Sequence, residues 1–347
     1  MELLSVTIND GVMPRSEIEG KDNSSEDKSN YKVVMTGDMV YNSMRMWQGA
    51  NGISPCDGIV SPAYTVLMPK ISIINGYFAA LFKSPNLINE FRKNSQGMTS
   101  DTWNLKYPQI ETIKVNIPDI PEQERIAALL GTLEKRIAAQ AQLVDSLKKY
   151  KRGLLHRLLT YKRAKWNRVK IGSIFKERIE RASGKEELLA VTISSGVQKR
   201  AEVELKDNSS ADKSNYKRVY AGDIAYNTMR MWQGASGVSE YEGIVSPAYT
   251  VITPIHPEEQ NVLFWAYYLK YPALVQTFQK FSQGLTSDTW NLKYQQLSEI
   301  GVLCPPKHEQ ATISLTLKTF DRKIHDSEVC LEQLFRLRAG LLQQLFI

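Results

Sequence analysis

The chain of 347 residues contains only three cysteines and four histidines. The cysteines (Cys56, Cys304 and Cys330) are widely spaced, so they predict neither a disulfide framework nor a CxxC metal pair. Such sparse cysteine use is typical of a reducing compartment, and we expect the protein to work in the cytoplasm. The histidines show no HxxxH-type spacing, and we therefore expect no bound metal ion.

Long apolar runs and catalytic motifs are also missing. No window approaches ~18 uninterrupted apolar residues, so no transmembrane helix is predicted. The N-terminus, MELLSVTIND, has neither the basic part nor the apolar part of a signal peptide. We find no GxxxxGK[ST], GxGxxG, GxSxG, HExxH or Asn-Pro-Pro-Tyr-type motif, and Ser-Pro-Ala-Tyr at 61–64 and 246–249 resembles the last only superficially. An enzyme with a degenerate motif stays open as an alternative.

Positive charge is unevenly placed along the chain. The formal net charge is +7, but residues 148–176 hold 11 Lys and Arg and no acid, which leaves 7 − 11 = −4 for the remainder. Such a run is either a solvated helix face and linker or a surface that faces phosphates.

The sequence contains an internal repeat. Residues 21–69 match residues 206–254 at 35 of 49 positions with an offset of 185. Residues 95–107 (SQGMTSDTWNLKY) match residues 282–294 at 12 of 13 positions with an offset of 187. Two copies of one structural unit are therefore predicted, and the near-identity of these segments indicates shared surface chemistry.

Each copy ends in a predicted long helix. Residues 122–160 and 309–347 share only 11 of 39 residues, but both place apolar residues at 3/4 spacing. The apolar positions are Ile126, Leu130, Leu133, Ile137, Val144, Leu147, Leu154 and Leu158, and Ile313, Leu317, Phe320, Ile324, Leu331, Leu334, Leu341 and Leu345. Polar residues interrupt the two patterns at equivalent places, Gln140 and Lys151, and Ser327 and Arg338. Helices of ~58 Å are predicted to form an intramolecular coiled coil; the alternative is that each packs on its own domain.

The rest of each copy is predicted to be mixed α/β. AYTVLMP and AYTVITP are typical of strands, residues 71–93 and 257–281 of helices, and NSSEDKSNYK, RMWQGANG and SQGMTSD of polar loops. The predicted fold class is α+β, with two mixed α/β domains joined by two long helices. The predicted boundaries are 1–121 and 161–308 for the domains, and 122–160 and 309–347 for the helices.

The polar loops hold the candidate DNA contacts. Arg can bind guanine through two hydrogen bonds, Asn and Gln can bind adenine, and Trp can stack, while Lys can contact phosphates. The candidates are Lys21, Lys28, Lys32, Asn42, Arg45, Trp47, Gln48, Gln96, Thr99, Ser100 and Asn104, and in the second copy Lys206, Lys213, Lys217, Asn227, Arg230, Trp232, Gln233, Gln283, Thr286, Ser287 and Asn291. The alternative for the tryptophans is a place in the core: Trp47, Trp103, Trp232 and Trp290. For four aspartates we expect turn or helix-cap roles rather than catalysis: Asp38, Asp101, Asp223 and Asp288.

These motifs, in one order and present twice, resemble the specificity subunit of type I restriction-modification enzymes. The resemblance covers essentially the whole chain. It rests on GDMVYNSMRMWQGANGISPCDGIVSPAYTV and its second copy, SQGMTSDTWNLKY running into IPDIPEQERIAALLGTLEKRI, KIGSIFKERIERAS (170–183) and GLLQQLF (340–346).

The resemblance implies two target-recognition domains, joined by an antiparallel pair of helices with pseudo-twofold symmetry. Each domain would read one half of a bipartite site in double-stranded DNA, and the chain would carry no active site. It would dock two modification subunits, which bind S-adenosylmethionine and methylate adenine, and through them restriction subunits that use ATP and Mg²⁺; this chain itself would bind no cofactor. A coiled-coil scaffold that does not bind DNA is the alternative.

Two further expectations follow from the repeat. Near-identical loops related by a twofold axis predict a palindromic or nearly palindromic target, with half-sites ~10 bp apart. Residues 166–186 have no counterpart in the first copy, because Met1–Leu4 align with residues 186–189. The first domain thus begins about twenty residues late, and we expect an exposed sheet edge there. Either its start is truncated or misplaced, which would leave the subunit partly inactive, or something else completes it.

Overall fold

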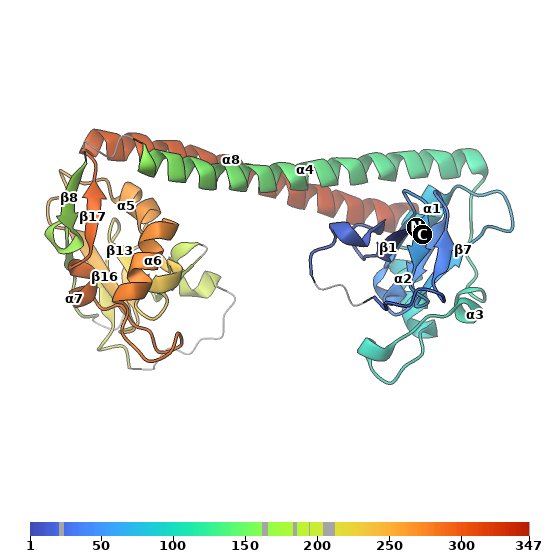
Figure 1. Cartoon of the computed structure of the whole chain (residues 1–347), viewed down its shortest axis with the longest axis horizontal. Helices are drawn as coiled ribbons and strands as arrows, with labels where there is room; N and C mark the ends of the chain where they lie inside the picture. Colours follow the sequence, from blue (N-terminus) through green and yellow to red (C-terminus); the bar gives the residue numbers. More distant parts are fainter. Residues whose placement is uncertain (21–23, 162–165, 183–185, 194, 204–211, 347) are drawn as a thin grey trace. The chain divides into compact units, whose positions relative to one another are not determined.

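The computed structural model describes residues 1–20, 24–161, 166–182, 186–193, 195–203 and 212–346. The chain forms two compact units (Figure 1). Unit 1 comprises Met1–Val144 and Asp326–Ile347, and unit 2 comprises Asp145–His325. Each unit therefore combines a globular part with one half of each long helix. None of the described helices has an apolar stretch long enough to cross a lipid bilayer.

The described part of unit 1 holds two small sheets and short helices. One sheet has the strand order β2-β1-β6-β3, with β1 and β6 parallel, and the other has the order β5-β4-β7. The elements are β1 (Glu2–Val6), β2 (Val12–Pro14), β3 (Lys32–Val34), β4 (Met39–Asn42), β5 (Asn51–Ile53), β6 (Gly58–Val60), β7 (Tyr64–Leu67), α1 (Asn75–Leu81), α2 (Pro85–Asn94) and α3 (Tyr107–Ile110).

Unit 2 repeats this plan with additional strands. Its main sheet has the order β14-β13-β16-β9, and three two-stranded sheets pair β10 with β11, β12 with β15, and β17 with β8 in the described residues. The elements are β8 (Asn167–Lys170), β9 (Phe175–Glu177), β10 (Leu189–Thr192), β11 (Gly196–Lys199), β12 (Lys217–Val219), β13 (Ile224–Asn227), β14 (Ser236–Val238), β15 (Gly243–Val245), β16 (Tyr249–Pro254), α5 (Val262–Tyr268), α6 (Pro272–Phe281), α7 (Tyr294–Ser298) and β17 (Gly301–Cys304). The predicted strands at AYTVLMP and AYTVITP are β7 and β16, and the predicted helical segments contain α1–α2 and α5–α6.

Alternation along the central strand separates two cores in each unit. In β13, Ile224 and Tyr226 belong to the cluster that includes α5 and α6, whereas Ala225 belongs to a second cluster between the strands. The same alternation places Tyr41 and Val40 of β4 in different cores of unit 1. Because neighbouring strand residues point to opposite faces, a short apolar strand can serve both cores.

Two long helices pack together, which confirms the predicted coiled coil. They are α4 (Ile120–Thr160) and α8 (Lys307–Leu345). Within unit 1, Leu133 and Ile137 of α4 pack with Leu334 of α8. The alternative is also partly right, because Ile126 and Leu130 of α4 join the core of the globular part. The helices are therefore tied both to each other and to the domains.

The polar interruptions of the apolar pattern meet partners on the other helix. Gln140 Nε2 donates to the Ser327 carbonyl oxygen at 2.9 Å in unit 1. Lys151 pairs with Asp321 in unit 2, and Arg338 pairs with Glu134 at 3.4 Å in unit 1. Since Asp321 and Glu134 are equivalent positions of the repeat, both units contain the same cross-helix ion pair. These contacts favour one antiparallel register, as polar seam residues do in other coiled coils.

Candidate nucleic-acid interface

The turn between β4 and β5 presents Arg45 to solvent in unit 1. Asn42 Oδ1 accepts a hydrogen bond from Met44 N at 3.0 Å, and a 3₁₀ helix (Met46–Gln48) follows. The Met46 side chain is buried and anchors the turn. Gly49 ends it with φ of 83°, a left-handed conformation that glycine adopts without strain. The backbone of the turn is thus held by other residues, and the exposed Arg45 guanidinium makes only a 3.5 Å hydrogen bond to Gln48 Oε1 among the described residues.

Unit 2 contains the same turn with almost the same geometry. Arg230 has φ −126° and ψ 8°, compared with −125° and 9° for Arg45. Gly234 repeats the left-handed conformation with φ of 81°. The Asn227 side chain again accepts from the backbone two residues later, at 3.0 Å. The two units therefore present one set of polar side chains on one backbone conformation.

A pair of tryptophans joins this turn to the second polar loop in each unit. The Trp47 and Trp103 rings make an edge contact with centroids 5.1 Å apart, and the Trp232 and Trp290 centroids lie 5.2 Å apart. Trp47 Nε1 donates to the Met44 carbonyl oxygen at 3.1 Å, and Trp232 does the same in unit 2. All four indoles are half-buried. They hold the two loops together, so the alternative that these tryptophans are core residues is only partly right.

The second polar loop is closed by its own hydrogen bonds. Gln96 and Asn104 exchange backbone hydrogen bonds of 3.0 and 2.9 Å, and Thr99 N donates to Thr102 Oγ1 at 3.1 Å. The same contacts join the equivalent residues of unit 2. The side chains of Gln96, Thr99 and Ser100 remain exposed, as do those of Gln283, Thr286 and Ser287. The structure thus brings these candidates beside the Arg45 and Arg230 turns.

An apolar side chain stands at the tip of this loop, and it was absent from the sequence-based candidates. Met98 is 98% exposed, and its counterpart Leu285 is fully exposed. The only available signal was that Met and Leu are the sole difference between the two matching segments. Apolar side chains at such tips can insert between base pairs.

A hollow of about 430 Å³ lies between the loops of unit 2. Thr228 and Met229 of the first turn, Asn291 of the second loop, and the lysines Lys217 and Lys293 all line it. The Thr228 hydroxyl also donates to the carbonyl oxygen of Ala248, which lies in the turn of residues 246–249, at 2.8 Å. Three segments far apart in the sequence therefore form one concave polar surface.

The lysine candidates differ in their surroundings. Lys28 is exposed and donates to the Ser25 carbonyl oxygen at 3.0 Å, and Lys213 is half-buried. Lys32 donates to the carbonyl oxygens of residues 62 and 64, whereas Lys217 pairs with Glu177 at 3.1 Å. Two further candidates lie outside the described residues: Lys21 and Lys206.

The aspartates in the Gly-Asp turns have the expected structural role. Asp38 Oδ2 accepts from Met35 N at 2.9 Å, and Asp223 Oδ2 accepts from Tyr220 N at 2.9 Å. In the second loop, however, Thr99 and Thr102 form the cap, and Asp101 lies in the first turn that they cap. Asp101 therefore has the turn position that was one of its two expected roles, and the threonines supply the cap.

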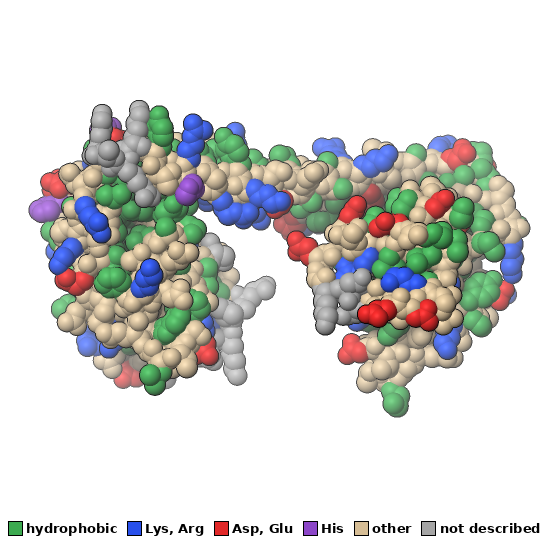
Figure 2. Space-filling view, viewed as in Figure 1, with side chains coloured by type: hydrophobic (Ala, Val, Ile, Leu, Met, Phe, Trp, Pro, Cys, Tyr) green, Lys and Arg blue, Asp and Glu red, His purple; other side chains and the backbone are tan. Residues whose placement is uncertain are grey.

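The basic run at 148–176 is partly neutralised. Lys149 pairs with Asp145 at 2.7 Å, and Lys170 pairs with Glu299 at 2.6 Å. Arg152 and Arg157 on α4 are exposed. Figure 2 shows Lys and Arg side chains over the part of the long helices that belongs to unit 2. Residues 162–165, which contribute three charges of the run, lie outside the described residues.

Comparisons with known proteins agree with this architecture. A family model described as "Type I restriction modification DNA specificity domain" matches residues 5–149 and 164–331. A type I restriction-modification S subunit from M. genitalium is similar at 15% identity with a TM-score of 0.58, over 91% of this chain and 84% of that one. A chain from a structure of type I system assembly and conformational transition matches at 16% identity and a TM-score of 0.54, over 91% and 83%. The HsdS subunit from Thermoanaerobacter tengcongensis matches at 15% identity and a TM-score of 0.48, over 96% and 85%.

Proposed function

We propose that each unit of this chain, which belongs to the family of type I restriction-modification DNA specificity proteins, reads one half of a bipartite DNA site. The helices α4 and α8 would set the distance between the half-sites. One observation carries the proposal: the Arg45 and Arg230 turns have Asn, Arg, Trp and Gln at equivalent positions, nearly equal backbone angles and the same tryptophan support. Equal reading surfaces favour equal half-sites, and hence a palindromic or nearly palindromic target.

Chemistry assigns different tasks to the side chains of this surface. Arg45 and Arg230 can each give two hydrogen bonds to guanine, and Gln48 and Gln233 can read adenine. The exposed Gln, Thr and Ser side chains of the second loop, together with Lys28 and Lys213, suit the sugar-phosphate backbone. Four further candidates would support the turn rather than contact bases, because their polar atoms already make hydrogen bonds within it: Asn42, Asn227, Trp47 and Trp232.

The chain would act without chemistry of its own. Two modification subunits would bind S-adenosylmethionine and methylate adenine, and restriction subunits would supply ATP- and Mg²⁺-dependent cleavage in the cytoplasm. The resemblance described above and the absence of nucleotide and methyltransferase motifs from the sequence support this division of tasks.

Co-purification with the modification subunit tests this proposal. We expect a stable complex that methylates DNA, whereas the chain alone should bind DNA without methylating or cutting it. Binding should weaken steeply with salt, with a log–log slope of about −0.9 for each neutralised phosphate. A shallow slope, or no binding, would favour the coiled-coil scaffold; methylation or cleavage by the chain alone would favour an enzyme.

A further inference from the structure

One segment of unit 1 lacks the strand partner that its counterpart has in unit 2. In unit 2, β17 pairs with β8 in an antiparallel register that places Val302 opposite Val169. The equivalent residues of unit 1, 114–117, lie in no strand and have no paired neighbour among the described residues. Val302 is 4% exposed, whereas its counterpart Val115 is 38% exposed. Segment 114–117 of unit 1 is therefore exposed where β17 of unit 2 is covered by β8.

The covering segment of unit 2, residues 166–178, is here called the leader. The leader binds the rest of unit 2 through its backbone as well as its side chains. For example, Ile171 N donates to the Ile300 carbonyl oxygen at 2.9 Å. Trp166 Nε1 donates to Glu309 Oε2 at 2.9 Å. Arg178 at its end makes two hydrogen bonds, of 2.7 and 3.0 Å, to the buried Asp223 carboxylate.

Unit 1 retains several of the side chains that bind the leader in unit 2, although Thr112 replaces Glu299, the partner of Lys170. Glu122 is the counterpart of Glu309, and its carboxylate has no hydrogen-bond partner among the described residues. Asp38 is the counterpart of Asp223, and within the described structure its carboxylate keeps only the hydrogen bond from Met35 N. Tyr107 is the counterpart of Tyr294. The Tyr294 hydroxyl donates to the Phe175 carbonyl oxygen of the leader at 2.7 Å, whereas the Tyr107 hydroxyl donates to Glu111 Oε1 at 3.3 Å.

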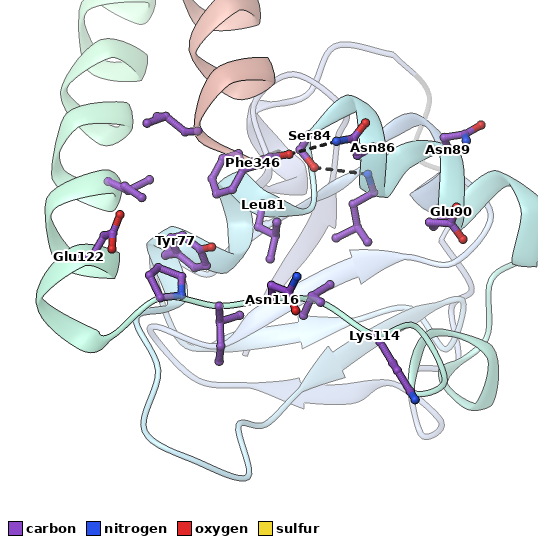
Figure 3. Close-up of a pocket in the computed structure, with 16 residues that line it drawn as sticks. Tyr77, Leu81, Ser84, Asn86, Asn89, Glu90, Lys114, Asn116, Glu122 and Phe346 are labelled. Carbon is purple, nitrogen blue, oxygen red and sulfur yellow. Dashed lines mark hydrogen bonds between the residues drawn. The ribbon is translucent and has the colours of Figure 1, made fainter.

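A groove of about 620 Å³ accompanies this exposed segment (Figure 3). Residues 114–118 form one wall, and apolar surface comes from Tyr77 and Leu81 of α1 and from Phe346, which follows α8. Two acids, Glu90 and Glu122, also line it, with one base, Lys114. In unit 2 the counterparts of these three apolar residues and of Val115 form one buried cluster with Trp166 of the leader (Leu159, Phe264, Tyr268 and Val302).

We infer that this groove is a docking site for a polypeptide strand that has the chemistry of the leader. The occupant would present a tryptophan, then alternating apolar and basic residues, and would add to residues 114–117 as an antiparallel strand. Strand addition to an open edge supplies backbone hydrogen bonds, and alternate side-chain pockets supply specificity. The leader has four bases (Arg168, Lys170, Lys176 and Arg178) against one acid, which complements the Glu122 carboxylate of the groove; the other acid, Glu90, already pairs with Lys93 at 2.7 Å. This inference does not depend on DNA reading.

A synthetic peptide of residues 166–178 tests the inference on the full chain. We expect saturable binding by calorimetry at one site per chain, with new protection of the amides at 114–117 from hydrogen exchange. A scrambled peptide of the same composition should bind at least about tenfold more weakly, because alternation must match the pleat. Absence of peptide binding, or protection confined to unit 2, would overturn the inference.

Variants in the groove separate docking from folding. Val115→Asp places a charge under the docked strand and should weaken peptide binding at least about tenfold, since a buried unpaired charge is costly. Val33→Asp makes the same change at another exposed position of unit 1, outside the groove, and should leave binding unchanged. Equal effects of both changes would contradict the assignment. Self-association that Val115→Asp abolishes would instead make a second copy of the chain the occupant and overturn the inference.

A double-mutant cycle tests the predicted tryptophan contact. Glu122→Ala and a peptide with Phe in place of Trp166 should each weaken binding about tenfold, as expected for a hydrogen bond to a charged group. Together they should weaken it no further than either alone, because both remove the same contact. Additive losses would show that the indole binds elsewhere.

Discussion

Replacing Arg230 with alanine separates base reading from structural support. The turn is held by the Asn227 side chain, the buried Met231 and the left-handed Gly234, and the exposed guanidinium has no part in those contacts. We therefore expect the free energy of unfolding to change by less than about 0.5 kcal/mol. Loss of a bidentate contact to guanine should cost about 1–3 kcal/mol, or about 5- to 160-fold in Kd.

The assay compares duplexes in which each half-site is varied in turn. Arg230→Ala should relax the base preference of one half-site, and Arg45→Ala should relax the other by a similar amount. The two effects should add, because the residues lie in separate units and share no partner. Arg336→Ala removes an exposed ion pair with Glu332 on α8 and serves as the control. An equal loss for every sequence would make Arg230 a phosphate contact, and unchanged binding would remove it from the interface.

Three other substitutions test the supporting structure. Trp232→Ala removes the edge contact to Trp290 and should lower the free energy of unfolding by about 2–3 kcal/mol in urea titrations; a change below about 0.5 kcal/mol would contradict its role in joining the loops. Leu285→Ser should leave stability within about 0.5 kcal/mol but weaken specific DNA binding severalfold, and normal binding would exclude insertion by this tip. Gln140→Leu exchanges one hydrogen bond for apolar burial, each worth about 1 kcal/mol, so stability should hardly change while an engineered cross-helix disulfide forms in lower yield. An unchanged yield would show that Gln140 does not specify the register.

The long helices were the most predictable part of the fold. An apolar stripe along one side of a helix appears in the sequence as apolar residues three or four positions apart, so neighbouring residues alone are enough to predict it. The polar interruptions were visible as equivalent positions, but their partners were not. Pairing of Lys151 with Asp321 follows from the antiparallel register, which spacing within one helix cannot specify.

The reading surface was predictable in composition and only partly in arrangement. The repeat singled out Arg45 and Gln96 with their loops, because it duplicated them almost without change. Contact between Trp47 and Trp103 joins residues 56 positions apart, and the exposure of Met98 depends on how its loop closes. The sequence comparison predicted an open sheet edge in the first domain, but the location of the groove beside Val115 and Glu122 required the pairing of β17 with β8.

Mapping of methylated adenines in DNA modified by the complex of this chain with its modification subunit tests the central claim most directly. Two equivalent reading surfaces predict one bipartite motif whose halves are the same sequence on opposite strands, with a fixed spacer and centres about 10 bp apart. Two unrelated half-sites would contradict the account.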